Sequence, residues 1–238
     1  MRNKWRINHL ILGASFLVLL IIVGSWIGSL NNIPVRNMLS TEGVRWILKN
    51  IVNNVEASPF ISLFILLTGF SILKASGFFR CFSLRKRKSY AFLGLSGKRL
   101  QAFLLATFFF IVYVGIVLVL TFSRYEILLS ITGGLERSPF LSALPFLIFV
   151  GCTVWGGIYG LASGVYQGLT DVVKGAIAVP AQLTGYFIYI MIISQLLAIW
   201  NYSDIDVYMD IDSSVMTITG WILYYVPLFG LLVVRRKA

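Results

Sequence analysis

Long apolar stretches alternate with short polar segments along this chain. Six of the stretches are long enough to be considered as membrane helices, at about residues 9–30, 59–79, 100–122, 139–163, 182–200 and 213–234. A helix needs about 20 mainly apolar residues to cross a hydrocarbon core of about 30 Å. Because backbone polar groups must be paired within lipid, an apolar stretch of this length is expected to be helical. The sequence therefore predicts an all-α integral membrane protein, a bundle of about six transmembrane helices that forms one membrane domain over residues 1–238.

The fifth apolar stretch is longer than one crossing requires, and it contains a proline. As a continuous helix, residues 172–200 would extend about 43 Å at 1.5 Å per residue. Pro180 removes a backbone donor and clashes with the preceding turn, which interrupts a helix. We therefore expect a short cytoplasmic-side helix at about 169–179, a break, and a membrane helix at 182–200.

A shorter amphipathic pattern lies between the first two spans, within residues 31–58. Ser40 is a suitable N-cap, and it is followed by apolar residues at helical spacing: Val44, Ile47, Leu48, Ile51 and Val55. Such a pattern predicts a helix that lies along the outer membrane face or packs on the bundle. A structural role is favoured over a partner-binding role.

Glycines line one face of the fourth span. Gly156, Gly160 and Gly164 are spaced four residues apart, and Cys152 precedes them on the same face. Small residues at this spacing let helix backbones approach closely in lipid. The pattern predicts a tight helix–helix contact, and the partner is either in this chain or in another copy. A homodimer through glycine-rich helix faces is one such arrangement.

Composition supports a membrane protein and argues against a nucleic-acid partner. The chain is 58% hydrophobic and 12% charged, with a net charge of +11, whereas soluble domains are about 25% charged. The Lys and Arg residues sit beside the hydrophobic spans, where they determine topology and meet anionic lipid headgroups. We therefore expect the lipid bilayer, and no nucleic acid, as the partner of this charge.

The distribution of basic residues predicts the orientation. All but five of the 20 Lys and Arg residues fall in the segments assigned to the cytoplasm, and the exceptions are Arg36, Arg45, Lys49, Arg124 and Arg137. The basic loop 80–99 is read as a topology determinant rather than as a lipid or partner site. Both termini are therefore expected in the cytoplasm, with the amphipathic helix outside.

The sequence contains few residues of the types that enzymes use for catalysis. The chain has one histidine, His9, and two cysteines, Cys81 and Cys152, and no Asp or Glu lies inside a predicted span. A metalloprotease needs clustered histidine and carboxylate ligands, and an aspartyl protease needs paired carboxylates. A Ser–His pair needs a third group that orients the histidine. We expect no enzymatic activity, no cofactor and no metal site.

The fifth span holds a set of uncharged polar side chains: Gln182, Thr184, Tyr186, Tyr189, Ser194 and Gln195. Oxygens near a broken membrane helix can form a sodium site. The same side chains can instead hydrogen-bond between helices, and this second interpretation is favoured on physical grounds.

Two segments, residues 39–78 and 138–204, resemble the p-aminobenzoyl-glutamate transporter (AbgT) family. The resemblance rests on EGVRWIL in the first segment, on DVVKG in the second, and on the tract from Gln195 to Asn201-Tyr-Ser. It implies a bacterial inner-membrane, multi-pass secondary transporter that acts as a dimer and moves p-aminobenzoyl-glutamate or antifolate-like carboxylates with an ion gradient.

The chain departs from that family in its transport hairpins. The Ser-Asn-Thr-type motif of the first hairpin has no counterpart between the second and third spans. Asp212-Ser213-Ser214 resembles the start of the second hairpin's Asp-Ser-Ser-Thr-Asn-type motif, but Val215 and Met216 follow. The chain thus resembles a shortened member that lacks most of the hairpin regions. The resemblance implies these ligand-binding candidates: Gln195, Asn201, Asp212, Ser213 and Ser214.

Two functional hypotheses remain. In the first, the protein moves a small carboxylate solute, coupled to Na⁺ or H⁺, as an oligomer. In the second, it is a non-transporting membrane scaffold or accessory subunit that retains only the family's scaffold helices. A water-accessible polar cavity near Pro180 would favour transport, whereas tight apolar packing there would favour the scaffold.

Overall fold

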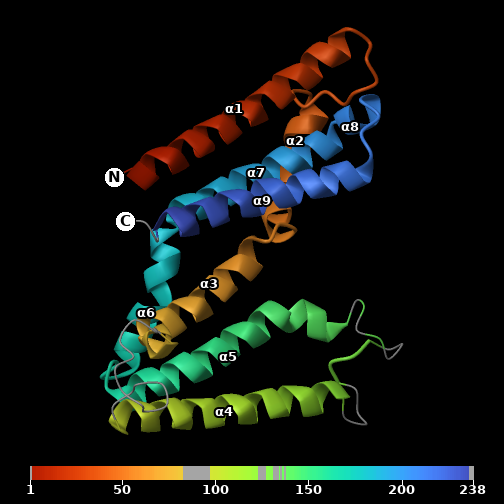
Figure 1. The fold of residues 1–238 in the computed structure, drawn as a ribbon. Coiled ribbons are helices and arrows are strands. Elements are labelled where there is room, and N and C mark those ends of the chain that lie inside the picture. Colours follow the sequence, from red (N-terminus) through yellow and green to blue (C-terminus); the bar gives the residue numbers. More distant parts are fainter. Residues whose placement is uncertain are drawn as a thin grey trace. The chain divides into compact units, whose positions relative to one another are not determined.

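The computed structural model describes residues 2–82, 97–122, 127–130, 134, 136 and 138–235, and helices are the only regular elements within them. Figure 1 shows their course: α1 (Arg2–Leu30), α2 (Thr41–Glu56), α3 (Phe60–Ala75), η1 (Phe78–Phe82), α4 (Gly97–Phe122), α5 (Pro139–Ser163), α6 (Leu169–Gln182), α7 (Thr184–Tyr202), α8 (Ile205–Tyr208) and α9 (Ser213–Arg235). The all-α prediction is confirmed.

Among the described residues, six helical segments are long and apolar enough to cross a membrane: Ile7–Leu30, Thr41–Ala75, Gly97–Phe122, Pro139–Ser163, Thr184–Tyr202 and Ser213–Leu231. The predicted number of spans is therefore confirmed. The orientation of the termini stays a prediction, and most of the basic loop, residues 83–96, lies outside the described residues.

The second span differs from the prediction. The apolar segment Thr41–Ala75 includes both α2 and α3, which are joined by a turn at residues 57–59. The α-helix α3 ends at Ala75, although the apolar pattern continues to residue 79, because Gly77 adopts a left-handed conformation with φ 77°. A short 3-10 helix, η1, follows.

The break near Pro180 is confirmed, but it lies further along the chain than expected. The helix α6 continues through Pro180 to Gln182, and Leu183 separates it from α7 with φ −106° and ψ 13°. A serine of α3 hydrogen-bonds to the α6 backbone just before the proline. The Ser71 hydroxyl donates to the Gly175 carbonyl oxygen at 2.5 Å and accepts from the Val179 amide at 2.9 Å. It thus contacts both members of an i, i+4 backbone pair of α6.

The chain forms two compact units, Met1–Ile61 with Leu183–Ala238, and Ser62–Gln182. In the first unit, α1, α2 and α9 each pack on α7, and residues of α1, α2 and α7 form a buried cluster with Met38 that includes Ile199. In the second unit, α4 packs on α5, and Phe78 and Tyr159 lie in its buried cluster. The single membrane domain expected from the sequence stays a prediction.

The glycine face of α5 makes the tight contact that its spacing predicts, and the partner is in the same chain. A Cβ atom on Gly156 would lie 2.7 Å from the Leu73 Cα atom of α3, and one on Gly69 would lie 2.9 Å from the Phe149 Cα atom. Gly160 faces the ring of Tyr166. Gly164 has a different role, because it ends α5 with φ 79°.

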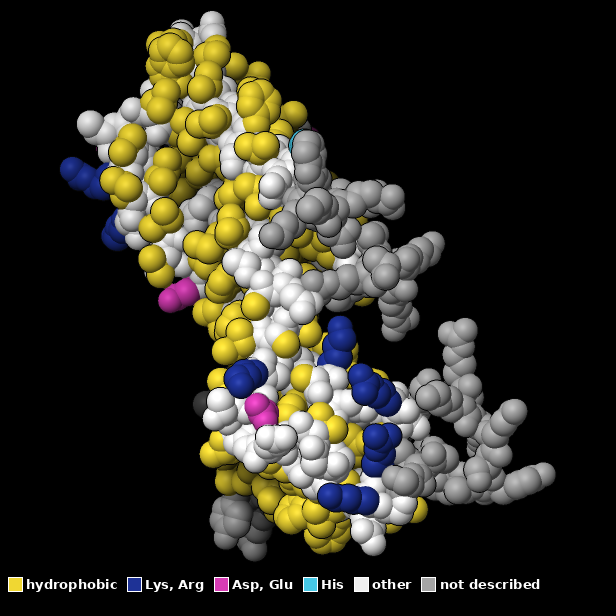
Figure 2. All heavy atoms as spheres, turned by 90° about the vertical axis from the view of Figure 1, so that its left-hand side faces the viewer, with side chains coloured by type: hydrophobic (Ala, Val, Ile, Leu, Met, Phe, Trp, Pro, Cys, Tyr) yellow, Lys and Arg dark blue, Asp and Glu magenta, His cyan; other side chains and the backbone are white. Residues whose placement is uncertain are grey.

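The amphipathic helix α2 forms, but its apolar stripe points outward. Ser40 caps the helix, since its hydroxyl oxygen accepts from the Gly43 amide at 3.1 Å. Leu48 is 69% exposed and Val52 is 62% exposed, whereas Ile47 packs on the core of the first unit. Hydrophobic side chains cover much of the face that Figure 2 shows. Such exposure is expected of helices that face lipid, where apolar side chains need not point inward.

Candidate functional site

The polar side chains of the fifth span mostly connect helices. The Tyr186 hydroxyl donates to the Tyr224 carbonyl oxygen of α9 at 2.7 Å, and the Tyr189 hydroxyl donates to the Leu223 carbonyl oxygen at 3.2 Å. Ser194 donates to the carbonyl oxygen of Met191 in its own helix at 2.8 Å. These contacts support the interpretation that the polar residues hydrogen-bond within and between helices.

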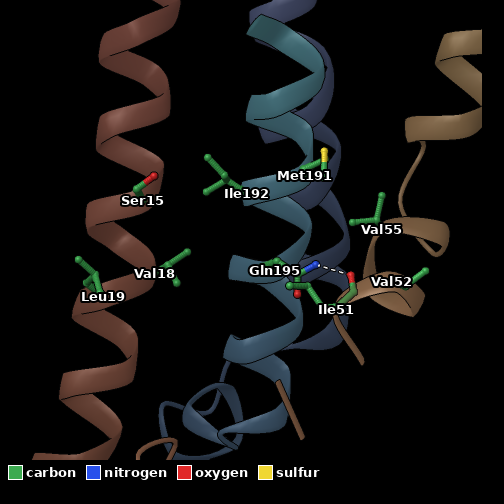
Figure 3. A pocket seen from close by; sticks show the side chains of 9 residues that line it. All are labelled: Ser15, Val18, Leu19, Ile51, Val52, Val55, Met191, Ile192 and Gln195. Carbon is green, nitrogen blue, oxygen red and sulfur yellow. Dashed lines mark hydrogen bonds between the residues drawn. The ribbon is translucent and has the colours of Figure 1, made fainter. Parts of the chain in front are cut away.

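Gln195 connects α7 to α2 through both ends of its amide. Its Nε2 atom donates to the Ile51 carbonyl oxygen at 2.8 Å, and its Oε1 atom accepts from Asn54 Nδ2 at 2.9 Å. Figure 3 shows the side chain turned toward α2. Because both of these partners belong to α2, Gln195 acts as a brace between two helices in this structure.

Asn201 lies near the end of α7 with its side chain exposed. Its carbonyl oxygen accepts from the amides of Ser203 and Asp204, which helps to close the helix. The side chain itself remains open to a ligand or to headgroups.

Asp212, Ser213 and Ser214 come together at the start of α9, where they form a capping cluster. The Asp212 Oδ1 atom accepts from the Ser214 amide at 3.1 Å, from the Ser214 hydroxyl at 3.1 Å and from the Ser213 hydroxyl at 3.3 Å. These hydrogen bonds lower the pKa of the exposed Asp212 carboxyl group, the backbone donor most strongly. This is the arrangement of an N-cap aspartate, which satisfies a free amide at a helix start.

The five candidate residues therefore occupy three separate places. Gln195 and Asn201 are about 9 Å apart along the axis of α7, given 1.5 Å per residue. The capping cluster belongs to another helix, and the side-chain hydrogen bonds of the described residues do not link these places.

The surroundings of Pro180 are tightly packed. Val179 and Leu183 are 4% and 2% exposed, and Pro180 is also buried. The Ser71 hydroxyl contacts the α6 backbone just before the proline, at Gly175 and Val179. A water-accessible polar cavity near Pro180 would have favoured transport, so this tight packing favours a structural role for the break.

A cluster of charged and aromatic side chains near the end of α7 was not anticipated from the sequence. Arg36 Nε lies 2.7 Å from Asp204 Oδ2, and the guanidinium carbon lies 5.0 Å from the centre of the Tyr202 ring. Tyr202 stacks on Trp46 of α2, with ring centres 4.0 Å apart. The only sequence signal was the Asn201-Tyr-Ser-Asp tract, and its partners lie far away in the chain.

An apolar groove of about 780 Å³ was also not anticipated. Three helices of the first unit form it, and its residues are Ser15, Val18 and Leu19 of α1, Ile51, Val52 and Val55 of α2, and Met191, Ile192 and Gln195 of α7. Figure 3 shows these side chains from the three helices. Because Gln195 turns its amide to α2, the groove offers almost only aliphatic surface.

Metal ligands are not gathered in the part of the chain that the structure describes. Within these residues, no three His, Cys, Asp or Glu side chains are placed to hold a metal ion.

The model of the AbgT putative transporter family matches residues 83–234, well over half of the chain. The match includes all five candidate residues and the second of the two resembling segments, 138–204. The first segment, 39–78, precedes it. No curated protein and no solved structure matches the chain.

Proposed function

Since the chain belongs to the AbgT putative transporter family, we propose that it moves a small carboxylate-bearing solute across a bacterial inner membrane. The family match carries this proposal, and the six membrane-length helices are consistent with it. The driving force we propose is a gradient of Na⁺ or H⁺. Because the family is one of transporters, the proposal includes no enzymatic step.

We further propose that transport is performed by an oligomer. In one chain, the amide of Gln195 is engaged by α2 and the carboxylate of Asp212 caps α9. A polar pathway through lipid needs groups that face a cavity, and additional copies would supply more of them. Gly24 of α1 has open space where a Cβ would be, whereas Gly28 one turn later packs against Val35, so a second copy would approach this helix at Gly24.

The proposed orientation places both termini in the cytoplasm, as the Lys and Arg distribution predicts. Fusions to the C-terminus test it. A fluorescent reporter that matures only in the cytoplasm is expected to be bright, and a phosphatase that is active only outside is expected to be silent. The reverse pattern would overturn the orientation.

A second function, a non-transporting scaffold or accessory subunit, is favoured by one specific observation. Pro180 and its neighbours Val179 and Leu183 are buried, and Ser71 contacts the α6 backbone just before the proline, which is the packing expected of a structural element.

Uptake by purified protein in liposomes separates the two functions. Labelled p-aminobenzoyl-glutamate is the probe, with an imposed Na⁺ or H⁺ gradient and protein-free liposomes as the control. A transporter is expected to accumulate the probe and to lose uptake on Gln195→Ala or Asp212→Asn. No accumulation above the control, and no change in either variant, would contradict transport and leave the accessory role.

A further inference from the structure

The outward face of α2 combines apolar and basic side chains. Val44, Leu48 and Val52 are exposed on it, and the basic side chains of Arg45 and Lys49 are exposed on the same helix. Residues 45, 49 and 52 follow one another at helical spacing of four and three, so they share a face. The basic pair thus stands directly in line with the α2 wall of the apolar groove.

The two basic residues border a hollow of their own. It measures about 730 Å³ and lies at the start of α2, with Val44, Arg45, Leu48 and Lys49 in its wall. Ion pairs among the described residues join Arg36 to Asp204 and Lys174 to Asp171. Neither pair involves Arg45 or Lys49, which leaves both positive charges available to an anion.

The apolar groove borders the following turns of the same helix, from Ile51 onward. From Lys49 to Val55 the helix rises about 9 Å, and Val52 and Val55 line the groove together with α1 and α7. The α1 and α7 walls belong to helices that are themselves long and apolar enough to cross a membrane, so the groove offers a surface of the kind that acyl chains contact. Its volume falls within the range of about 300–1,000 Å³ that ligand sites have.

We propose that this surface binds an anionic glycerophospholipid. Arg45 and Lys49 hold the headgroup phosphate, because basic side chains at a membrane surface attract anionic lipid. One acyl chain lies in the groove formed by α1, α2 and α7. The charge of the hollow and the apolar lining of the groove match the two ends of one such molecule, and the site lies entirely within the first unit.

Lipid retention tests the proposal. The full chain is extracted from vesicles of equal phosphatidylglycerol and phosphatidylcholine with identical acyl chains, and bound lipid is counted by native mass spectrometry. The amount of retained phosphatidylglycerol is expected to exceed that of phosphatidylcholine by on the order of tenfold, because two basic side chains at a membrane surface attract the anionic headgroup. The double change Arg45→Gln with Lys49→Gln is expected to abolish the preference, while Val52→Trp, which fills the groove, lowers retention of both lipids.

A matched control removes two exposed charges elsewhere. Lys98→Gln with Arg99→Gln, on α4, is expected to keep the preference of the unchanged protein. Inorganic phosphate at millimolar concentration is expected not to displace the lipid, because it lacks the acyl chain. The proposal is overturned if the α2 double variant retains phosphatidylglycerol normally, if both double variants lose it equally, or if phosphate alone displaces it.

Discussion

Single atoms determine how closely α3 and α5 approach in the second unit. A methyl group on Gly156 would lie 2.7 Å from the Leu73 Cα atom and 3.0 Å from its nitrogen. Backbone atoms cannot move aside as a flexible side chain can, so the helices would have to separate.

We therefore predict that Gly156→Ala lowers the free energy of unfolding by about 1–3 kcal/mol, the usual cost of overpacking. The neighbouring Gly157→Ala is the control, because a Cβ there meets nothing within 4 Å and alanine favours a helix by up to about 1 kcal/mol. Unfolding by dodecyl sulfate in mixed micelles measures both. Equal effects of the two changes would contradict the close contact.

Asp212 is the residue whose protonation we expect to matter for local order. Its folded-state pKa is lowered from the ordinary value of 3.8 by hydrogen bonds, chiefly from the Ser214 amide. A group with a lowered folded-state pKa stabilises the fold above its unfolded pKa, and this contribution is lost as the pH falls through the folded value.

We predict that the first turn of α9 frays below pH 3.8 and in Asp212→Ala, but not in Asp212→Asn at neutral pH. Asparagine is also a good N-cap, whereas alanine is not. Hydrogen exchange at the amide of Ser214, which donates to Asp212, reports the change. Unchanged protection in Asp212→Ala would show that the cap has no such role.

At the scale of elements, α6 depends on a side chain from α3. The Ser71 hydroxyl connects the Gly175 carbonyl oxygen and the Val179 amide just before Pro180. Removal of this hydroxyl takes a hydrogen-bond partner from both the Gly175 carbonyl and the Val179 amide.

We predict that Ser71→Ala lowers the unfolding free energy by about 1–3 kcal/mol, the cost of leaving a buried polar group unsatisfied. Thr68→Ala on the same helix is the control, since Thr68 donates only to the Phe64 carbonyl oxygen of its own helix. Thermal unfolding in detergent compares the two variants. A loss in Thr68→Ala as large as in Ser71→Ala would refute a special role for the bridge.

The brace between α2 and α7 is also measurable. Gln195→Ala and Asn54→Ala remove the two partners of a 2.9 Å hydrogen bond. We predict a coupling free energy of about 0.5–1.5 kcal/mol in a double-mutant cycle. Gln101→Ala, at an exposed glutamine of α4, should show no coupling with Asn54→Ala. A coupling near zero for Gln195 would mean that its hydrogen bond does not hold α2.

Local patterns predicted much of the fold, because apolar length, capping chemistry and proline act within a few residues. The six spans, the Ser40 cap and the glycine contact of α5 all follow from such patterns. The shift of the break from Pro180 to Leu183 does not follow from them, and neither does the contact of Ser71 with α6, which joins residues more than 100 positions apart.

The candidate site was less predictable. The sequence identified Gln195 as a polar residue in a span, but its partners Ile51 and Asn54 lie more than 140 residues away. The apolar stripe of α2 predicted an amphipathic helix correctly, but not which of its residues would pack on the first unit and which would face outward. In lipid, an apolar face has no need of a protein partner, so hydropathy alone does not say where it points.

For the whole molecule, family membership supports transport, whereas the packing within one chain supports a structural role. The match to the AbgT family over residues 83–234 supports transport. The polar side chains of α7, in contrast, largely serve contacts within one chain. The proposed transport by an oligomer accommodates both observations, because each copy would supply a braced set of helices and several copies would complete the pathway.

Gradient-driven uptake at two protein densities tests this account most directly. Liposomes are prepared with several copies per vesicle or with at most one, at equal total protein, and uptake of labelled p-aminobenzoyl-glutamate is followed with and without a Na⁺ or H⁺ gradient. We predict gradient-dependent accumulation in the crowded vesicles and a large loss when each vesicle holds one copy. Equal uptake per copy at both densities would contradict the oligomer, and absence of uptake at both would contradict transport.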